Sequence, residues 1–167
     1  MRLVFLDIDG VLNQGYDKVR GAPSGFDYSV PSCVLALNGL TRALQASIVI
    51  SSSWRLEHSL EQLRTVLRGF GVEAPIIDVT PEIDDARGFP AARIAEICHF
   101  LDHQEHGVVE SFVVLDDQDI RLDIDNELVR VAEIEARFIR TVTEVGLTDA
   151  LAVDAARALT RRLRQAA

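Results

Sequence analysis

Cysteines and long apolar runs are scarce in this chain of 167 residues. Its two cysteines, Cys33 and Cys98, lie far apart, and Cys98 falls in an apolar helical pattern. Two buried free thiols are therefore expected rather than a disulfide. No apolar run approaches the ~20 residues that a membrane-spanning helix needs. Asp7 ends the apolar N-terminal run after four residues, which leaves no signal-peptide core. A soluble, cytoplasmic protein is the expectation.

Positive charge is also in short supply. Lysine and arginine total 17 against 26 aspartates and glutamates, which gives a formal net charge of −9. This balance disfavours broad electrostatic binding of nucleic acid or of an anionic membrane. It leaves room for a local cationic pocket. A cluster of carboxylates around a metal ion would account for part of the imbalance.

The rest of the composition is that of an ordinary globular protein. Hydrophobic residues make up 48% of the chain and charged residues 26%, which excludes a wholly disordered chain. The length fits one domain with one hydrophobic core, spanning residues 1–167. No internal repeat, low-complexity stretch or linker interrupts it.

Short apolar runs alternate with helical patterns along the chain. Buried strands are predicted at residues 3–6, 47–50, 74–77, 111–115 and 137–141. Helices are predicted at residues 32–45 and 57–68, from Pro90 onward, and from Thr148 to about Leu163, with a loop at 13–32. This alternation predicts an α/β fold in which helices cover both faces of a five-stranded parallel sheet.

Polar residues stand where three of these strands end. Asp7 and Asp9 follow the first strand, Ser51 follows the second, and Asp116 and Asp117 follow the fourth. Ligands bind at the carboxyl ends of parallel strands. On extended backbone, residues two apart point the same way, so Asp7 and Asp9 can face one site.

Four carboxylates at one edge of a sheet require a cation, because crowded like charges are unfavourable. An all-oxygen site suits Mg²⁺. Gly10 permits a tight turn and a close backbone approach beside it. An aspartate that meets a metal-bound phosphate can attack it and form an aspartyl-phosphate. A second acid can protonate the leaving oxygen and later activate water.

These motifs resemble the haloacid dehalogenase (HAD) superfamily of phosphatases. The family's four motifs are matched in order by residues 6–13 (LDIDGVLN), residues 48–51 (IVIS), Arg93 and residues 113–117 (VVLDD). A narrower likeness is to the small HAD domains of the Swiss-army-knife RNA-repair type. It is carried by residues 48–55 (IVISSSWR), 80–81 (TP), 93–97 (RIAEI) and 146–148 (GLT).

The resemblance implies a role for each residue of the motifs. It implies a three-layer, Rossmann-like HAD fold with Asp7 as nucleophile and metal ligand. Asp9 would be the general acid and base, with its backbone carbonyl on the metal. Ser51 would bind the phosphoryl oxygens and Arg93 would offset their charge. Asp116 or Asp117 would complete a Mg²⁺ site, and the choice between the two stays open. Substrate contacts are expected from Gly10, Ser52 and Arg55.

The cation of the third motif departs from the family pattern. That position is most often lysine, and here it is Arg93. Arginine keeps the charge and adds a bidentate fork suited to phosphate. Arg55 and Arg87 are the alternatives, and Arg55 could instead hold a distal part of the substrate. Trp54 is expected to be a packing residue, with stacking on a substrate base or ring as the alternative.

Little or no cap domain is expected over the site. Caps in HAD enzymes enter between the first and second motifs or between the second and third. Here the first interval, residues 14–46, is mostly loop and one helix, and the second, residues 54–92, is largely consumed by the fold itself. The loop 14–30 could act as a partial lid. An open site admits a large substrate, such as a nucleic-acid end or a phosphoprotein. The leading expectation is a phosphomonoesterase acting on an exposed phosphate of a polynucleotide end, and the net charge of −9 keeps a nucleotide open as its substrate. A small-metabolite phosphatase and a catalytically silent binding or regulatory domain are the alternatives.

Overall fold

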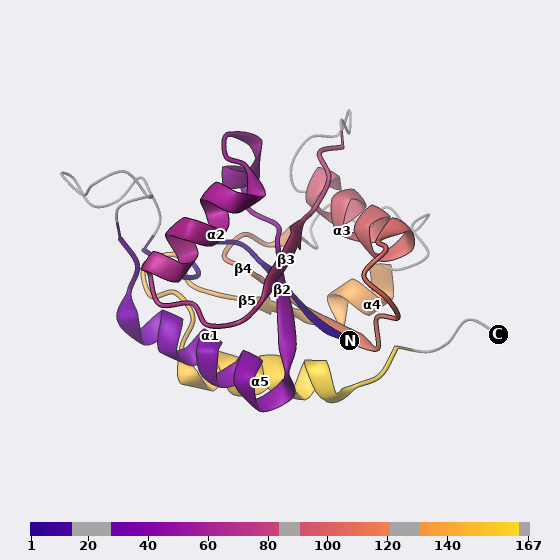
Figure 1. The fold of residues 1–167 in the computed structure, drawn as a ribbon. Helices are drawn as coiled ribbons and strands as arrows, with labels where there is room; N and C mark the ends of the chain where they lie inside the picture. The colour runs from indigo at the N-terminus through magenta and orange to yellow at the C-terminus, as the bar shows by residue number, and fades with distance from the viewer. Residues whose placement is uncertain (15–27, 84–90, 121–130, 164–167) are drawn as a thin grey trace.

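The computed structural model describes residues 1–14, 28–83, 91–120 and 131–163. Within these ranges, helices flank a five-stranded sheet (Figure 1). The strands are β1 (Arg2–Leu6), β2 (Ala46–Ile50), β3 (Ile76–Val79), β4 (Ser111–Asp116) and β5 (Phe138–Arg140). The helices are α1 (Pro31–Leu44), the 3-10 helix η2 (Ser53–Leu56), α2 (Leu60–Gly69), α3 (Ala91–His103), α4 (Val131–Glu135) and α5 (Asp149–Thr160).

The sheet is parallel throughout and has the order β3-β2-β1-β4-β5. The predicted α/β class and five-stranded parallel sheet are therefore confirmed. The first strand of the chain lies at the centre, between β2 and β4. The residues that follow β1 thus have neighbours on both sides from the ends of β2 and β4.

The sheet separates two apolar cores. In β1, Val4 and Leu6 belong to the core that α1, α2 and α5 cover. Leu3 and Phe5 point to the other face and join the core beneath α3 and α4. Helices α1 and α5 lie side by side (Figure 1). Burial on both faces explains why the strands are continuous apolar runs rather than alternating ones.

Strand register brings the strand ends to one level. Leu6 pairs with Ile50 of β2 and with Leu115 of β4. The next residues continue this alignment, because Ser51 N–H donates to the Leu6 carbonyl at 2.8 Å and Asp7 N–H donates to the Leu115 carbonyl at 2.9 Å. The polar residues after the three strands are therefore neighbours at the same edge of the sheet.

Helix α2 begins three residues later than the sequence predicts. Its first residue is Leu60, preceded by Ser59 in extended conformation. The Ser59 side chain accepts a hydrogen bond from Gln62 N–H, and the Gln62 side chain accepts one from Ser59 N–H. This reciprocal capping box fixes the start of the helix.

Helix α5 begins as predicted and ends earlier than predicted. Thr148 caps it by accepting a hydrogen bond from a backbone N–H of the first turn. The helix ends at Thr160 and not near Leu163. The buried Arg137 guanidinium donates to the Ala158 carbonyl at 2.9 Å. Arg137 lies in the segment between β4 and β5, so a distant side chain provides a hydrogen-bond donor to a carbonyl at the end of α5. The sequence around the helix end gives no sign of this contact.

Two short helical segments are absent from the sequence prediction. Both η2 and α4 span at most five residues, too few to display a helical period. Segment η2 matters for the site, because it follows β2 directly. The Ser52 side chain accepts a hydrogen bond from Trp54 N–H at its start.

Four further expectations concern the cap, the lid, the cysteines and membrane-spanning helices. The described parts of residues 14–46 and 54–92 consist mainly of α1, η2, α2 and β3, as expected for a fold with little cap. The proposed lid over 14–30 falls mostly outside the described residues. Cys33 and Cys98 are free and buried, which confirms that prediction. None of the helices in the described ranges combines the length and apolar character needed to cross a bilayer.

Candidate active site

Three aspartates meet at the carboxyl edge of the central strands. Carboxylate oxygens of Asp7, Asp116 and Asp117 all lie within 4.8 Å of one another. Asp7 follows β1, Asp116 ends β4, and these two side chains are almost wholly shielded from solvent. The sequence predicts this meeting, because parallel strands end at the same edge of their sheet. The strand register confirms that β1 and β4 end side by side.

The burial of these acids raises the pKa values of two of them. Burial raises the pKa of Asp7 to about 6, although the charge of Arg93 and a hydrogen bond from the Ser52 side chain act in the opposite direction. Burial raises the pKa of Asp116 to about 8, and the neighbouring charge of Asp7 adds to the rise. A cation placed among the three carboxylates would relieve this repulsion. Their oxygen donors fit Mg²⁺, which commonly takes one or two carboxylates and completes its shell with phosphate and water.

Arg93 brings a positive charge to the same cluster. Its Nη1 donates to Asp116 Oδ2 at 2.9 Å and lies 3.7 Å from Asp7 Oδ1. The residue stands in the first turn of α3, and its side chain is 9% exposed. Arg93 thus lies where a cation for the third motif is needed. Arg87 lies outside the described residues.

Arg55 has a different environment from the one expected. Its Nη2 lies 2.5 Å from Glu96 Oε2 in α3, and both side chains are buried. Its Nη1 donates to the Ser52 carbonyl at 2.8 Å and its Nε to the Thr80 carbonyl at 3.0 Å. These contacts tie η2 to α3 and to the end of β3. They give the expected substrate contact of Arg55 no support.

Asp9 is held by two side-chain donors. Trp54 Nε1 donates to Asp9 Oδ2 at 2.8 Å, and Asn13 Nδ2 donates to Asp9 Oδ1 at 2.8 Å. Asn13 Oδ1 in turn accepts from Gly10 N–H at 3.0 Å. Trp54 therefore makes a polar contact with a motif residue, and is not only the packing residue that its type suggested. The Asp9 carboxylate stands apart from the three-aspartate group found among the described residues.

Ser51 and Ser52 differ in what their hydroxyls contact. The Ser52 side chain bonds to Asp7 and caps η2. The Ser51 hydroxyl is buried and has no hydrogen-bond partner in the part of the chain that the structure describes. The Thr80 hydroxyl, just after β3, is also buried and without a hydrogen-bond partner among the described residues. Buried polar groups are normally hydrogen-bonded, so the Ser51 hydroxyl is available to donate to a ligand oxygen at the edge where the three aspartates meet.

Gly10 lies in a tight turn that packs closely against Asp117. Its φ is +71°, and a Cβ at this position would lie 2.4 Å from Asp117 Oδ2. Thr141 Oγ1 donates to the Gly10 carbonyl at 2.7 Å, and Thr143 Oγ1 donates to Asp117 Oδ2 at 2.5 Å. The two threonines of the chain after β5 are thus part of the site's framework. No sequence motif considered above included them.

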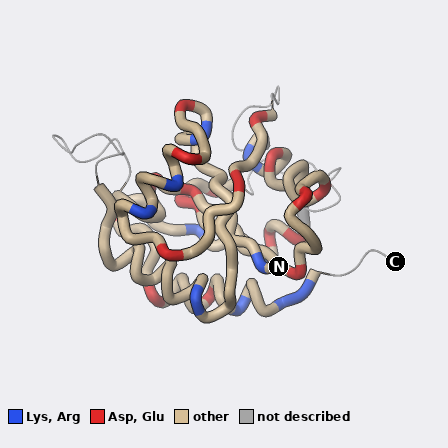
Figure 2. The backbone as a smooth tube through the Cα atoms, in the orientation of Figure 1, with Lys and Arg blue, Asp and Glu red and all other residues tan. Residues whose placement is uncertain are grey.

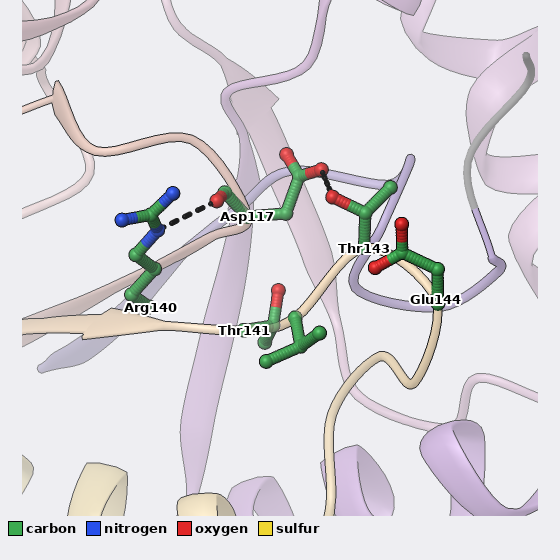
Figure 3. Close-up of a pocket in the computed structure, with 6 residues that line it drawn as sticks. Asp117, Arg140, Thr141, Thr143 and Glu144 are labelled. Carbon is green, nitrogen blue, oxygen red and sulfur yellow. Dashed lines mark hydrogen bonds between the residues drawn. The ribbon is translucent and has the colours of Figure 1, made fainter.

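A cavity of about 320 Å³ opens beside Asp117 (Figure 3). It is lined by Asp117, Arg140, Thr141, Val142, Thr143 and Glu144. Arg140 Nε donates to the Asp117 carbonyl at 3.0 Å, and the Arg140 side chain is 56% exposed. The candidate metal ligand Asp117 therefore borders open space on the β5 side of the sheet.

Comparison with known proteins identifies one family. The family model described as "HAD domain in Swiss Army Knife RNA repair proteins" matches residues 3–152. Comparison with curated proteins and with solved structures gave no match. The matched range contains every residue of the acidic cluster, Arg93 and the Ser51–Arg55 segment.

Proposed function

From the membership of this chain in the HAD domain family of Swiss Army Knife RNA repair proteins, we propose that it is a Mg²⁺-dependent phosphomonoesterase that works through an aspartyl-phosphate. Family membership supports a phosphatase-type hydrolase in general. The finer assignment rests on the site. The observation that carries it is the meeting of Asp7, Asp116 and Asp117 within 4.8 Å, with Arg93 bonded to Asp116.

Asp7 is the proposed nucleophile. It lies at the end of the central strand. Burial raises its pKa to about 6, and Arg93 and the Ser52 side chain act in the opposite direction, toward the charged form. One of its oxygens attacks the phosphorus of a phosphate ester, a P–O bond forms to Asp7, and the ester P–O bond breaks. The electron pair of the broken bond leaves with the ester oxygen.

The transferring phosphoryl group carries negative charge that the site must offset. Arg93 Nη1, already 3.7 Å from Asp7 Oδ1, supplies a cation at that position. The orphaned Ser51 hydroxyl supplies a hydrogen bond to a phosphoryl oxygen. Bound Mg²⁺, held by Asp7, Asp116, Asp117 and the Asp9 carbonyl, would neutralise the remaining charge and orient the phosphate.

Asp9 is the proposed general acid and base. It gives a proton to the leaving oxygen when the ester bond breaks. In the second half of the reaction a water molecule attacks the phosphorus and passes a proton to Asp9. The bond between phosphorus and Asp7 then breaks, which releases inorganic phosphate and restores both aspartates.

Hydrolysis of p-nitrophenyl phosphate with and without MgCl₂ tests this proposal. The protein should be active with Mg²⁺ and inactive in EDTA, and Asp7→Asn should reduce kcat by at least ~10³-fold. Asp154→Asn is the matched control, because Asp154 is an exposed acid on α5 that pairs with Arg157. Lack of any Mg²⁺-dependent turnover, or full turnover by Asp7→Asn, would favour a catalytically silent binding domain.

The substrate proposed is an exposed phosphate on a polynucleotide end or on a nucleotide. In the described parts of residues 14–46 and 54–92, the chain is mainly α1, η2, α2 and β3, all of which belong to the core fold, and this supports an open site that a large substrate could enter. Basic and acidic positions are interspersed along the described backbone (Figure 2), which suits recognition of one phosphate more than tight binding along a polyanion. A panel of 3′- and 5′-phosphorylated oligonucleotides, nucleotides and sugar phosphates tests this choice. A preference for sugar phosphates would indicate the small-metabolite alternative.

A further inference from the structure

Trp54 is the only tryptophan in the chain, and it lies at the candidate site. It belongs to η2, which starts three residues after the end of β2. Its indole ring is partly buried and packs against the core on the α1 side of the sheet. Its Nε1 donates to Asp9 Oδ2 at 2.8 Å. One side chain thus combines an apolar anchor with a polar contact to the proposed acid and base.

The two oxygens of Asp9 receive different donors. Trp54 Nε1 bonds Oδ2, while Asn13 Nδ2 bonds Oδ1 at 2.8 Å. The Asn13 amide is itself oriented, because its oxygen accepts from Gly10 N–H. An indole N–H only donates, and its ring cannot swing without disturbing the core. The orientation of the Asp9 carboxylate is therefore fixed by one donor on each of its oxygens.

The segment that carries Trp54 also contacts the other aspartate of the motif. The Ser52 side chain bonds Asp7, and the Ser52 hydroxyl caps the turn that presents Trp54. Arg55, next along the chain, is fastened to Glu96 of α3. The turn after β2 is thereby fixed at both ends. A rigid support of this kind is what a catalytic group needs to keep its position within a fraction of an ångström.

We propose that Trp54 is a positioning residue for Asp9, and that its indole N–H sets the carboxylate where it can give a proton to the leaving oxygen. This inference rests on the proposed function, in which Asp9 is the general acid. It differs from a packing role, which the ring alone would fulfil. It also differs from stacking on a substrate base, which would use the face of the ring and not the N–H at its edge.

Replacing the N–H alone separates these roles. Because the chain has a single tryptophan, growth with the analogue β-(benzo[b]thien-3-yl)alanine changes Trp54 and no other residue. Sulfur then replaces the N–H while the bicyclic ring is kept. Trp54→Phe provides a second, genetically encoded loss of the donor. Phe70→Leu is the packing control, because Phe70 also packs against this core and its side chain has no hydrogen-bond donor.

The readout is the dependence of kcat on the leaving group. A p-nitrophenolate ion leaves readily without a proton, whereas an alkoxide does not, so a misplaced acid slows alkyl phosphates most. The sulfur analogue and Trp54→Phe should lose ~10-fold or more in kcat with an alkyl phosphate and less than ~3-fold with p-nitrophenyl phosphate, as part of the 10²–10⁴-fold that acid catalysis supplies. KM should change little. Phe70→Leu should lower Tm and leave the ratio of the two rates unchanged.

Two results would overturn the inference. One is equal rates for the sulfur analogue and the unmodified protein on both substrates, and the other is an equal loss on both. A double-mutant cycle adds a second criterion, since Trp54→Phe should have no further effect in an Asp9→Asn background. Inactivity of the unmodified protein on either substrate would instead contradict the proposed function, so the two failures can be told apart.

Discussion

The guanidinium of Arg55 and the carboxylate of Glu96 form an ion pair with 2.5 Å between Nη2 and Oε2. The two side chains are 5% and 7% exposed, so the pair is almost wholly removed from water. It joins the turn after β2 to α3, the helix that also carries Arg93. The two arginines thus have separate tasks. Arg93 lies among the aspartates, and Arg55 supports the segment around them.

Removing one partner of this pair should destabilise the protein strongly. Arg55→Met or Glu96→Leu leaves the other charge buried and unpaired, which costs about 3–5 kcal/mol of unfolding free energy. The double variant Arg55→Met/Glu96→Leu should lose less unfolding free energy than the two single variants together, because it leaves neither charge unpaired. Urea denaturation of the four proteins measures these values. A single variant of Arg55 that kept full stability but raised KM would restore the substrate-contact interpretation.

Gly10→Ala should damage the metal site. The added Cβ would lie 2.4 Å from Asp117 Oδ2, and the backbone has a φ of +71° that L-residues disfavour by about 1–2 kcal/mol. Asp117 must move away from the other two aspartates, which weakens Mg²⁺ binding. The rise in Tm on adding MgCl₂ should therefore be smaller in the variant than in the unmodified protein. Gly39→Ala is the matched control, because Gly39 lies in α1 with nothing within 4 Å of a built Cβ. That change should leave the Mg²⁺ response intact and stabilise the helix by about 0.5–1 kcal/mol.

The fold and the acidic cluster were predictable because each depends on local pattern plus topology. Continuous apolar runs identify buried parallel strands, and parallel strands deliver their ends to one edge. Asp7 and Asp116 could therefore be placed together without knowledge of any contact. The positive φ of Gly10 agrees with the tight turn that the sequence predicts. Its close approach to Asp117 could not be predicted, because Asp117 follows another strand.

The partners of Trp54 and Arg55 could not be read from the sequence. Trp54 bonds a residue 45 positions away, and nothing in the pattern around it distinguishes an indole that packs from one that also donates. Arg55 and Arg93 were both plausible cations by spacing. Glu96, which holds Arg55, is one of several acids in the chain. A guanidinium is long enough to reach either place, so tertiary packing decides between them.

The stability of the metal-free protein should fall as pH rises from about 4 to 8. The pKa values of Asp7 and Asp116 are raised from 3.8 to about 6 and about 8 in the folded state. Across that window the folded protein binds more protons than the unfolded chain, so raising the pH favours unfolding. Urea denaturation in EDTA at pH 5 and pH 8 measures the difference.

Asp116→Asn should reduce this pH dependence, because the amide does not titrate. Asp154→Asn, which changes an exposed acid on α5, should leave the pH dependence unchanged. Saturating MgCl₂ should also reduce the fall, since a cation among the carboxylates favours their charged forms. Stability that rose with pH in EDTA would contradict the assigned burial of these two acids.

Ser51→Ala should separate stability from activity. The Ser51 hydroxyl is buried and makes no hydrogen bond to the described residues, so its removal should change the free energy of unfolding by less than about 0.5 kcal/mol. If it binds a phosphoryl oxygen in the reaction, the lost bond is worth about 1.5–3 kcal/mol, which lowers kcat/KM by ~10- to 100-fold. Thr80→Val removes the other orphaned hydroxyl one strand farther from Asp7, and should leave kcat/KM within about twofold. Equal losses from the two changes would mean that the hydroxyls act together on the substrate, and no loss from Ser51→Ala would remove Ser51 from the reaction.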